Sequence, residues 1–308
     1  MTFFSENKKK IMIVMFVVLG MAAALWGVNS LRGHGYGTMV KTYIHYWLNP
    51  VDLDKYEPLS EGMAEWLKED TLLAHAMGGI GESTYTNSLE AFEAAYENGF
   101  RVYEVDLVVT KVGEVICSHE YLDENGEVIE YSSFMQEKIE DKYTPIDLKK
   151  LIDLMENYPD VYIMTDIKWD NSMGSSNEDV VTLVSALVEE ANVRETEDIL
   201  ERMIIQIYNP KSYEIMKSIY PFRNYVYTLY HYASPIYEEI LGFCLENNLP
   251  VVAMEESRVS KDIVEYFNQW NIEVLVYTIN DESTASKLRD FGVKGIYTDW
   301  LMPECEEE

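Results

Sequence analysis

The sequence predicts an α/β protein, a (β/α)8 TIM barrel preceded by one N-terminal transmembrane helix. From residue 71 onward, eight short apolar runs follow one another, with helix-like segments between them. Residues 71–303 also have about the length of this fold, roughly 250 residues. An open doubly wound sheet is the alternative, because alternation alone does not show that a sheet closes. No glycine-rich dinucleotide fingerprint follows the first strand.

The N-terminus predicts a membrane anchor. Lysines at 8–10 precede residues 11–28, eighteen residues without a charge, which is about the length that spans a bilayer. The lysines place residues 1–10 in the cytoplasm and the rest of the chain outside it, as a single-pass protein of the cell membrane. A cleaved signal peptide is the alternative, since the alanines at 22–24 could serve as its cleavage region. The apolar run is longer than the usual core of a signal peptide and favours the anchor.

Residues 29–70 form a predicted juxtamembrane segment rich in aromatic residues. Such a segment could lie at the headgroup level of a membrane. Equally, it could be a helical segment packed on the barrel. Residues 304–308 form an acidic tail.

Composition limits the partners. The hydrophobic fraction of 47% supports a large core, and the formal net charge of −30 argues against a nucleic-acid partner. Three cysteines without metal-ligand spacing are interpreted as ordinary residues. The sequence does not set the oligomeric state.

The predicted strands are the apolar runs 71–75, 101–107, 161–167, 203–208, 225–230, 250–254, 273–279 and 295–298. Helix starts are predicted at Thr144-Pro145, Asn209-Pro210 and Ser234-Pro235, where a capping residue precedes proline. Asn87 with Glu90 has the pattern of a capping box, and Asn98-Gly99 ends that helix.

One further run, residues 115–118, lies too close to the second strand for a crossover helix. It is predicted to return antiparallel through a turn near Gly113. With the turn centred near 111–112, position 104 pairs with 119, which brings His119 beside Glu104.

Charged residues interrupt two of the predicted strands at two-residue spacing, which points both members of a pair to one face. The pairs are Glu104 with Asp106 and Asp166 with Lys168. At the carboxyl ends of barrel strands they would meet, and three converging carboxylates favour a hard divalent cation, Mg²⁺ or Ca²⁺.

His75 and His119 lie at the ends of neighbouring runs and could move protons. The alternative is structural: a lone histidine at a strand end, or an Asp166–Lys168 pair that only neutralises itself. Convergence on adjacent strands favours a site.

These residues lie in motifs that resemble the glycerophosphodiester phosphodiesterase family. The motifs are His75-Ala-Met-Gly78, Asn87-Ser-Leu-Glu-Ala-Phe92, Glu104-Val-Asp106, Ile116-Cys-Ser-His-Glu120, Asp166-Ile-Lys168, Tyr277-Thr-Ile-Asn280 and Gly295-Ile-Tyr-Thr-Asp299. The family has His-Arg-Gly, Glu-Asn-Thr, Glu-x-Asp, His-Asp, Glu-x-Lys, Trp-Thr and Gly-x-x-Thr-Asp in the same order.

The resemblance implies a metal-dependent phosphodiesterase, with a small-molecule or lipid phosphodiester as its substrate. The predicted place of the barrel beside a membrane, and not the resemblance, suggests lipid headgroups or surface glycerophosphate polymers. The resemblance also implies that Glu104, Asp106 and Asp166 bind the metal. By the same resemblance, His75 and His119 are the general base and acid, and Lys168 stabilises charge on the phosphate.

The chain departs from the family at four positions. Ala76 replaces the family's arginine, and Thr86 replaces the glutamate of Glu-Asn-Thr. Asp166 replaces the glutamate of Glu-x-Lys, and Tyr277 replaces the tryptophan of Trp-Thr. Asp-x-Lys also resembles spider-toxin phospholipases D, which release a cyclic phosphate, so a cyclic product is one alternative. A non-catalytic surface binding module is another, with Ala76 as its main support.

Overall fold

The computed structural model describes residues 50–68, 70–168, 177–194, 197–230 and 236–303. The chain divides into two units, residues 1–51 and 52–308, and the second contains the barrel. The predicted cytoplasmic segment 1–10, membrane helix 11–28 and acidic tail 304–308 lie outside the described residues. Within the described ranges, no helix has the length and apolar character needed to span a bilayer.

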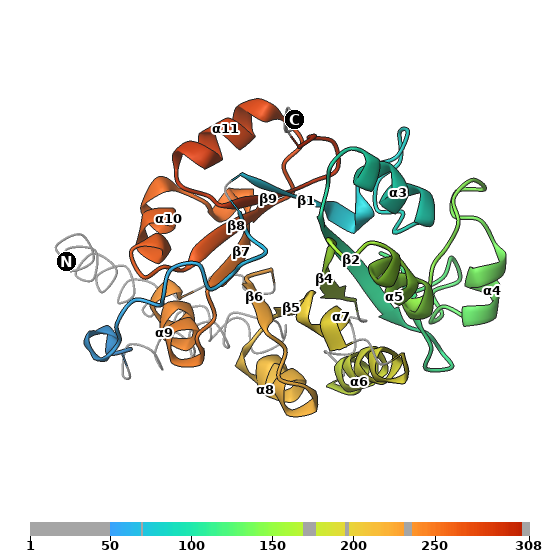
Figure 1. Ribbon diagram of the computed structural model, residues 1–308, viewed down its shortest axis with the longest axis horizontal. Helices are drawn as coiled ribbons and strands as arrows, with labels where there is room; N and C mark the ends of the chain where they lie inside the picture. Colours follow the sequence, from blue (N-terminus) through green and yellow to red (C-terminus); the bar gives the residue numbers. More distant parts are fainter. Residues whose placement is uncertain (1–49, 69, 169–176, 195–196, 231–235, 304–308) are drawn as a thin grey trace, which may run out of the picture. The chain divides into compact units, whose positions relative to one another are not determined.

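Eight parallel strands form a closed barrel, which confirms the predicted (β/α)8 barrel and excludes the open sheet (Figure 1). The strands are β1 (Thr71–Ala74), β2 (Val102–Val109), β4 (Tyr162–Ile167), β5 (Met203–Ile207), β6 (Asn224–Thr228), β7 (Val251–Glu255), β8 (Glu273–Tyr277) and β9 (Gly295–Thr298). Closure comes from β1, which pairs with both β2 and β9. Every predicted strand exists, with ends that differ by at most two residues.

Helices surround the strands (Figure 1). They are α3 (Leu89–Glu97), α5 (Leu148–Asn157), α6 (Asn177–Val193), α7 (Glu197–Glu201), α8 (Pro210–Ile219), α9 (Tyr237–Asn247), α10 (Lys261–Asn268) and α11 (Glu282–Asp290). A shorter helix, α4 (Tyr131–Gln136), lies in the connection after β3 (Val115–Cys117), and three 3-10 turns are η1 (Leu53–Lys55), η2 (His75–Met77) and η3 (Glu256–Arg258). The apolar faces of the helices pack on the outward side chains of the strands in one large core.

The barrel interior holds a second cluster of buried residues, contributed by all eight parallel strands and including Met164, Leu275 and Tyr297. Ala64, Trp66 and Leu67 belong to this cluster. Leu67 lies against Gly295, the first residue of β9, so residues 64–67 lie at the N-terminal end of the barrel. The opposite end is left to the polar residues of the site.

The strand β3 returns antiparallel to β2, as predicted, but one residue out of the expected register. Val109 pairs with Val115 and Leu107 with Cys117, so the turn is centred on Val112. The turn needs a left-handed residue, which Gly113 supplies with φ +88°. The prediction that position 104 pairs with 119 is therefore wrong, and a one-residue shift exchanges the faces of the strand.

Two of the helix starts differ from the prediction because the expected cap residues have other partners. The N-caps of α3 and α5 are Ser88 and Asp147. Asn87 instead bonds Asp106, and Glu90 accepts bonds from the backbone and hydroxyl of Thr144. The start of α8 at Pro210, capped by Asn209, is confirmed, as is the end of α3 at Asn98. The predicted cap at 234–235 lies outside the described residues, and α9 begins at Tyr237.

Candidate active site

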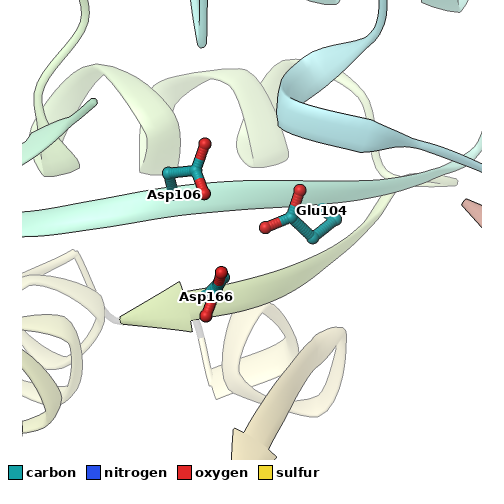
Figure 2. A group of neighbouring side chains, drawn as sticks. All are labelled: Glu104, Asp106 and Asp166. Carbon is teal, nitrogen blue, oxygen red and sulfur yellow. The ribbon is translucent and has the colours of Figure 1, made fainter. Parts of the chain in front are cut away.

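Three carboxylates converge at the C-terminal end of the barrel (Figure 2). Glu104 and Asp106 lie on β2, and Asp166 lies on the neighbouring β4, paired in register with Asp106. One carboxylate oxygen from each residue lies within 4.8 Å of the other two. Glu104 and Asp106 are buried, so their charges repel one another with little screening by water.

Asp106 is held by two neighbours. Its Oδ2 accepts a hydrogen bond of 2.7 Å from Asn87 Nδ2, while its backbone N–H donates to Asn87 Oδ1. Its Oδ1 is buried and has no hydrogen bond of good geometry among the described residues, although Lys168 Nζ lies 2.8 Å away as an ion-pair partner. Asn87 therefore fixes the carboxylate and leaves one oxygen directed at a cation.

Glu104 accepts a 2.8 Å hydrogen bond from the backbone N–H of Ala76. Burial and the charge of Asp106 raise the pKa of Glu104 to about 8. Ala76 has a left-handed backbone, φ 48°, and is fully buried. An arginine at this position would have to displace packed neighbours. Residue 76 therefore contributes to the site through its backbone N–H, which binds Glu104, and not through a side chain.

Asp166 is oriented by Tyr208, whose hydroxyl donates a 2.5 Å hydrogen bond to Oδ1. Lys168 Nζ lies 2.6 Å from the other oxygen. Burial would raise the pKa of Asp166, but the charge and hydrogen bond of Lys168 lower it overall. In turn, burial would lower the pKa of Lys168, and Asp166, Asp106 and Glu104 raise it. Lys168 thus stays charged and pairs with two of the three carboxylates.

His75 is held by Asp299, which follows β9. His75 Nδ1 lies 2.8 Å from Asp299 Oδ1, and its Nε2 lies 3.9 Å from Glu104 Oε2. Burial would lower the pKa of His75, but the hydrogen bond to Asp299 and the charges of Glu104 and Asp299 raise it to about 9. Because a carboxylate only accepts, Nδ1 carries a proton in both charge states of the ring, and Nε2 is the nitrogen that gains or loses one.

His119 lies at the mouth of the site, with 38% of its side chain exposed. Its Nδ1 is 3.1 Å from Glu120 Oε1. The ring of Tyr85 stands between the two histidines, with its centroid 4.9 Å from that of His75 and 4.6 Å from that of His119. Despite the register shift, His119 therefore reaches the same site as His75.

These groups line one cavity of about 340 Å³. Glu104, Asp166, Lys168 and both histidines are part of its wall. Five tyrosines complete much of the rest, namely Tyr85, Tyr208, Tyr230, Tyr277 and Tyr297. With a divalent cation at the carboxylates, the arrangement could bind a small anion at its base while aromatic rings contact the groups attached to it.

The carboxylate cluster fits a divalent cation. It offers only oxygen ligands, which Mg²⁺ and Ca²⁺ prefer, and three carboxyl groups face one ammonium. The buried Oδ1 of Asp106, without a hydrogen bond of good geometry, is the kind of atom that a metal ligates. Glu104, Asp106 and Asp166 are thus the residues that would hold the ion.

Residues 79–301 match the model of the glycerophosphoryl diester phosphodiesterase family. The chain belongs to this family. It is a glycerophosphodiester phosphodiesterase-like hydrolase. The match begins four residues after His75, so the place of that histidine in the site depends on the geometry above.

Solved structures of the same kind share the barrel. A glycerophosphoryl diester phosphodiesterase from Silicibacter pomeroyi has a TM-score of 0.62 and 17% identity, and covers 78% of this chain and 95% of its own. A phosphodiesterase from Oleispira antarctica, in complex with the product sn-glycerol-3-phosphate, has a TM-score of 0.62 and 17% identity, over 77% and 95%. A glycerophosphodiester phosphodiesterase from Thermotoga maritima has a TM-score of 0.54 and 18% identity, and the likeness covers 75% of this chain and 94% of that one. A search of curated proteins finds no match.

All six residues expected from the sequence lie at this site, and four more support them. Asp299 holds His75, and Asn280 holds Asp299 by donating from Nδ2 to Oδ2 over 2.8 Å. Asn87 and Tyr208 hold two of the carboxylates. Asn87, Asn280 and Asp299 occur in the family motifs, which is the signal that could have marked them. Tyr208, at the end of β5, has no such signal in the sequence.

Proposed function

We propose that this protein hydrolyses glycerophosphodiesters with a divalent cation held by Glu104, Asp106 and Asp166. The observation that carries the proposal is the meeting of two carboxylates, one lysine and two histidines in a single cavity of the barrel, with the carboxylate of Asp106 beside them. The cavity accommodates a phosphodiester and the glycerol attached to it.

The two histidines have the positions of a general base and a general acid. A divalent cation at the carboxylates would favour the neutral form of His75. In that form Nε2 accepts the proton of the attacking water as its oxygen bonds to phosphorus, while Asp299 holds the proton on Nδ1. His119 donates a proton to the alcohol oxygen as the phosphorus–oxygen bond breaks. Glu120 accepts from Nδ1 of His119, which leaves Nε2 for this transfer.

Lys168 stabilises the negative charge that develops on the phosphoryl oxygens. A bound divalent cation supplies a Lewis acid that polarises the same oxygens. Because Ala76 replaces the family arginine and is buried, Lys168 is the fixed positive charge of the cavity among the described residues. We expect Lys168→Met to lose more activity than the same change at exposed Lys261.

We propose the glycerophosphate half of the substrate from the similarity of this chain to a solved phosphodiesterase. The phosphodiesterase from Oleispira antarctica was solved with sn-glycerol-3-phosphate as its product. The tyrosines that line the cavity in this chain supply hydroxyls and ring faces for a glycerol unit.

Phosphorus NMR of the products tests the proposal and the alternative of a cyclic phosphate. Hydrolysis predicts glycerol 3-phosphate alone at the end of the reaction, whereas a persistent cyclic phosphodiester would contradict it. His75→Ala and His119→Ala are each expected to lower kcat by about 10²–10⁴, the range that general acid–base catalysis contributes. Full activity in both variants would show that the site is misassigned.

We also propose that residues 11–28 anchor the barrel to the outer face of a cell membrane, where lipid headgroups or surface glycerophosphate polymers are substrates. The support is the charge-free run after three lysines. Protease treatment of intact and of lysed cells tests this. We expect the barrel to be degraded in both, and protection in intact cells would contradict the proposed orientation.

A further inference from the structure

The two histidines of the site differ in how firmly their polar partners hold them. His75 bonds Asp299, which is buried and has only 5% of its side chain exposed. The polar partner of His119 is its neighbour Glu120, which has 78% of its side chain exposed. Water screens an ion pair at such a position, so the pair orients its members only weakly. The ring of His119 therefore needs a second contact to keep it directed at the cavity.

The ring of Tyr85 supplies such a contact. Its centroid lies 4.6 Å from that of His119, with the two planes at 53°, and 4.9 Å from that of His75, with the planes at 80°. Both distances lie in the range of favourable aromatic pairs, about 4.5–7 Å. Tyr85 also lines the active-site cavity together with both histidines. Its ring thus packs on His119 and fills the space between that residue and His75.

The chain holds Tyr85 in place from the C-terminal side. Residue 85 has a left-handed backbone, φ 60°, which residues other than glycine seldom adopt and which persists where the surroundings enforce it. Two residues later, the backbone N–H of Asn87 donates to the carbonyl of Ala76 over 3.2 Å. The side chain of Asn87 is bound to Asp106 through both its amide nitrogen and its oxygen. The segment after Tyr85 is therefore fixed to the carboxylate cluster.

The N-terminal side of the same loop is fixed as well. Ile80 and Ser83 exchange two backbone hydrogen bonds of 2.9 Å. The carbonyl of Ile80 also accepts a 3.2 Å hydrogen bond from the hydroxyl of Tyr143, and the hydroxyl of Ser83 donates to Glu140. Because both sides of the loop are bound, the ring of Tyr85 has the rigid support that a residue needs in order to orient another.

We propose that Tyr85 is a positioning residue for His119. Its ring holds the imidazole in the orientation from which His119 protonates the leaving alcohol. This inference rests on the proposed function, in which His119 is the general acid. The role belongs to the ring and not to the hydroxyl, because the contacts with the histidines are between rings. Tyr85→Phe should therefore preserve this role, and Tyr85→Leu should lose it.

Two substrates with different leaving groups separate this role from others. Glycerophosphoglycerol releases an alkoxide, which needs the proton of an acid, whereas glycerophospho-4-nitrophenol releases a phenolate that leaves without one. A displaced His119 should therefore lower kcat for the first substrate only. A displaced His75, the proposed base, should lower kcat for both. Because residue 85 is 41% exposed, we expect its variants to fold.

We expect Tyr85→Leu to lower kcat about 10- to 100-fold on glycerophosphoglycerol and less than about threefold on the nitrophenyl ester, with KM within about threefold for both. Tyr85→Phe should match the wild type on both substrates. When His119→Ala is already present, Tyr85→Leu should cause no further loss on glycerophosphoglycerol. The matched control is Tyr220→Leu, because Tyr220 makes a similar edge contact, 4.9 Å from Phe222, outside the cavity wall.

The three-bond NMR couplings of the His119 side chain give a second readout that needs no turnover. They report whether the side chain occupies one rotamer or several. We expect one rotamer in the wild type and in Tyr85→Phe, and averaged couplings in Tyr85→Leu.

Unchanged kcat in Tyr85→Leu, or equal losses on the two substrates, would overturn the inference. A further loss when Tyr85→Leu is added to His119→Ala would also overturn it. His119→Ala alone tests the proposed function, since equal losses on the two substrates would show that His119 is not the acid. In that case the couplings decide the inference. Averaging in Tyr85→Leu would keep Tyr85 as the residue that holds His119, and a single rotamer would overturn that as well.

Discussion

Asp299→Asn tests how the proton of His75 is controlled. The change keeps the shape of the side chain and removes its charge. Asn280 Nδ2 donates to Asp299 Oδ2, so the new amide is expected to turn its oxygen to Asn280 and its NH₂ to His75. His75 Nδ1 would then have to accept, which moves the ring proton to Nε2. In that tautomer Nε2 cannot accept a proton from water.

The magnitude follows from the pKa of His75. Its value of about 9 stands 2.5 above the ordinary 6.5, which corresponds to about 3 kcal/mol at 1.36 kcal/mol per unit. A histidine with a raised pKa stabilises the fold fully below about pH 6.5, and that stabilisation is lost as pH rises through about 9. We therefore expect Asp299→Asn to lose up to about 3 kcal/mol of unfolding free energy at pH 6 and clearly less at pH 9.5.

Three measurements check this prediction. Proton–carbon NMR titration is expected to give a His75 pKa well below 9 in the variant, and urea unfolding at both pH values gives the stability difference. The variant is also expected to lower kcat by about 10²–10⁴. Asp262→Asn, at an exposed position on α10, is the control. The reasoning is refuted if Asp299→Asn leaves the His75 pKa near 9 and kcat within about threefold of wild type.

The remaining predictions concern the carboxylates and the absent arginine. Tyr208→Phe removes the hydroxyl that bonds Asp166 and should cost about 1–3 kcal/mol in urea unfolding. The hydroxyl of Tyr225 makes only a 3.5 Å hydrogen bond, to the carbonyl of Tyr220, so Tyr225→Phe should lose less unfolding free energy. Equal losses in the two variants would contradict the role of Tyr208. Below about pH 8, the affinity for Mg²⁺ or Ca²⁺ should increase by up to about tenfold for each unit that the pH rises, because the metal displaces the proton of Glu104. Calorimetry at pH 6.5 and 8.5 measures this, and a flat profile would argue against Glu104 as a ligand. Ala76→Arg should lower the Tm without raising kcat, since the position is fully buried; a faster and equally stable variant would show that an arginine can reach the phosphate.

The strands of the barrel could be predicted closely because each is buried on both faces, which leaves an almost continuous apolar run in the sequence. The burial of both strand faces also made the site recognisable in the sequence. A charge within such a run, as at Glu104 and Asp106, has no place in a core and must serve another purpose. The histidines and Lys168 followed from their places at the ends of these runs.

The rest depends on contacts that local patterns do not contain. Asn87 looks like a helix cap, but its side chain is used by Asp106, and only the fold brings the two together. Tyr208 meets Asp166 across neighbouring strands, 42 positions away in sequence. The turn near Gly113 was predicted, but its centre is Val112 rather than a point between 111 and 112, and this shifts the β2–β3 register by one residue.

The account depends most on a divalent cation held by Glu104, Asp106 and Asp166. The most direct measurement is glycerol 3-phosphate release from a glycerophosphodiester by chelator-treated protein, titrated with Mg²⁺ and with Ca²⁺, for wild type and Asp106→Asn. We predict no release after chelation, recovery on addition of one of the two ions, and little recovery in Asp106→Asn. Full activity in the chelated protein, or normal recovery in Asp106→Asn, would contradict the account.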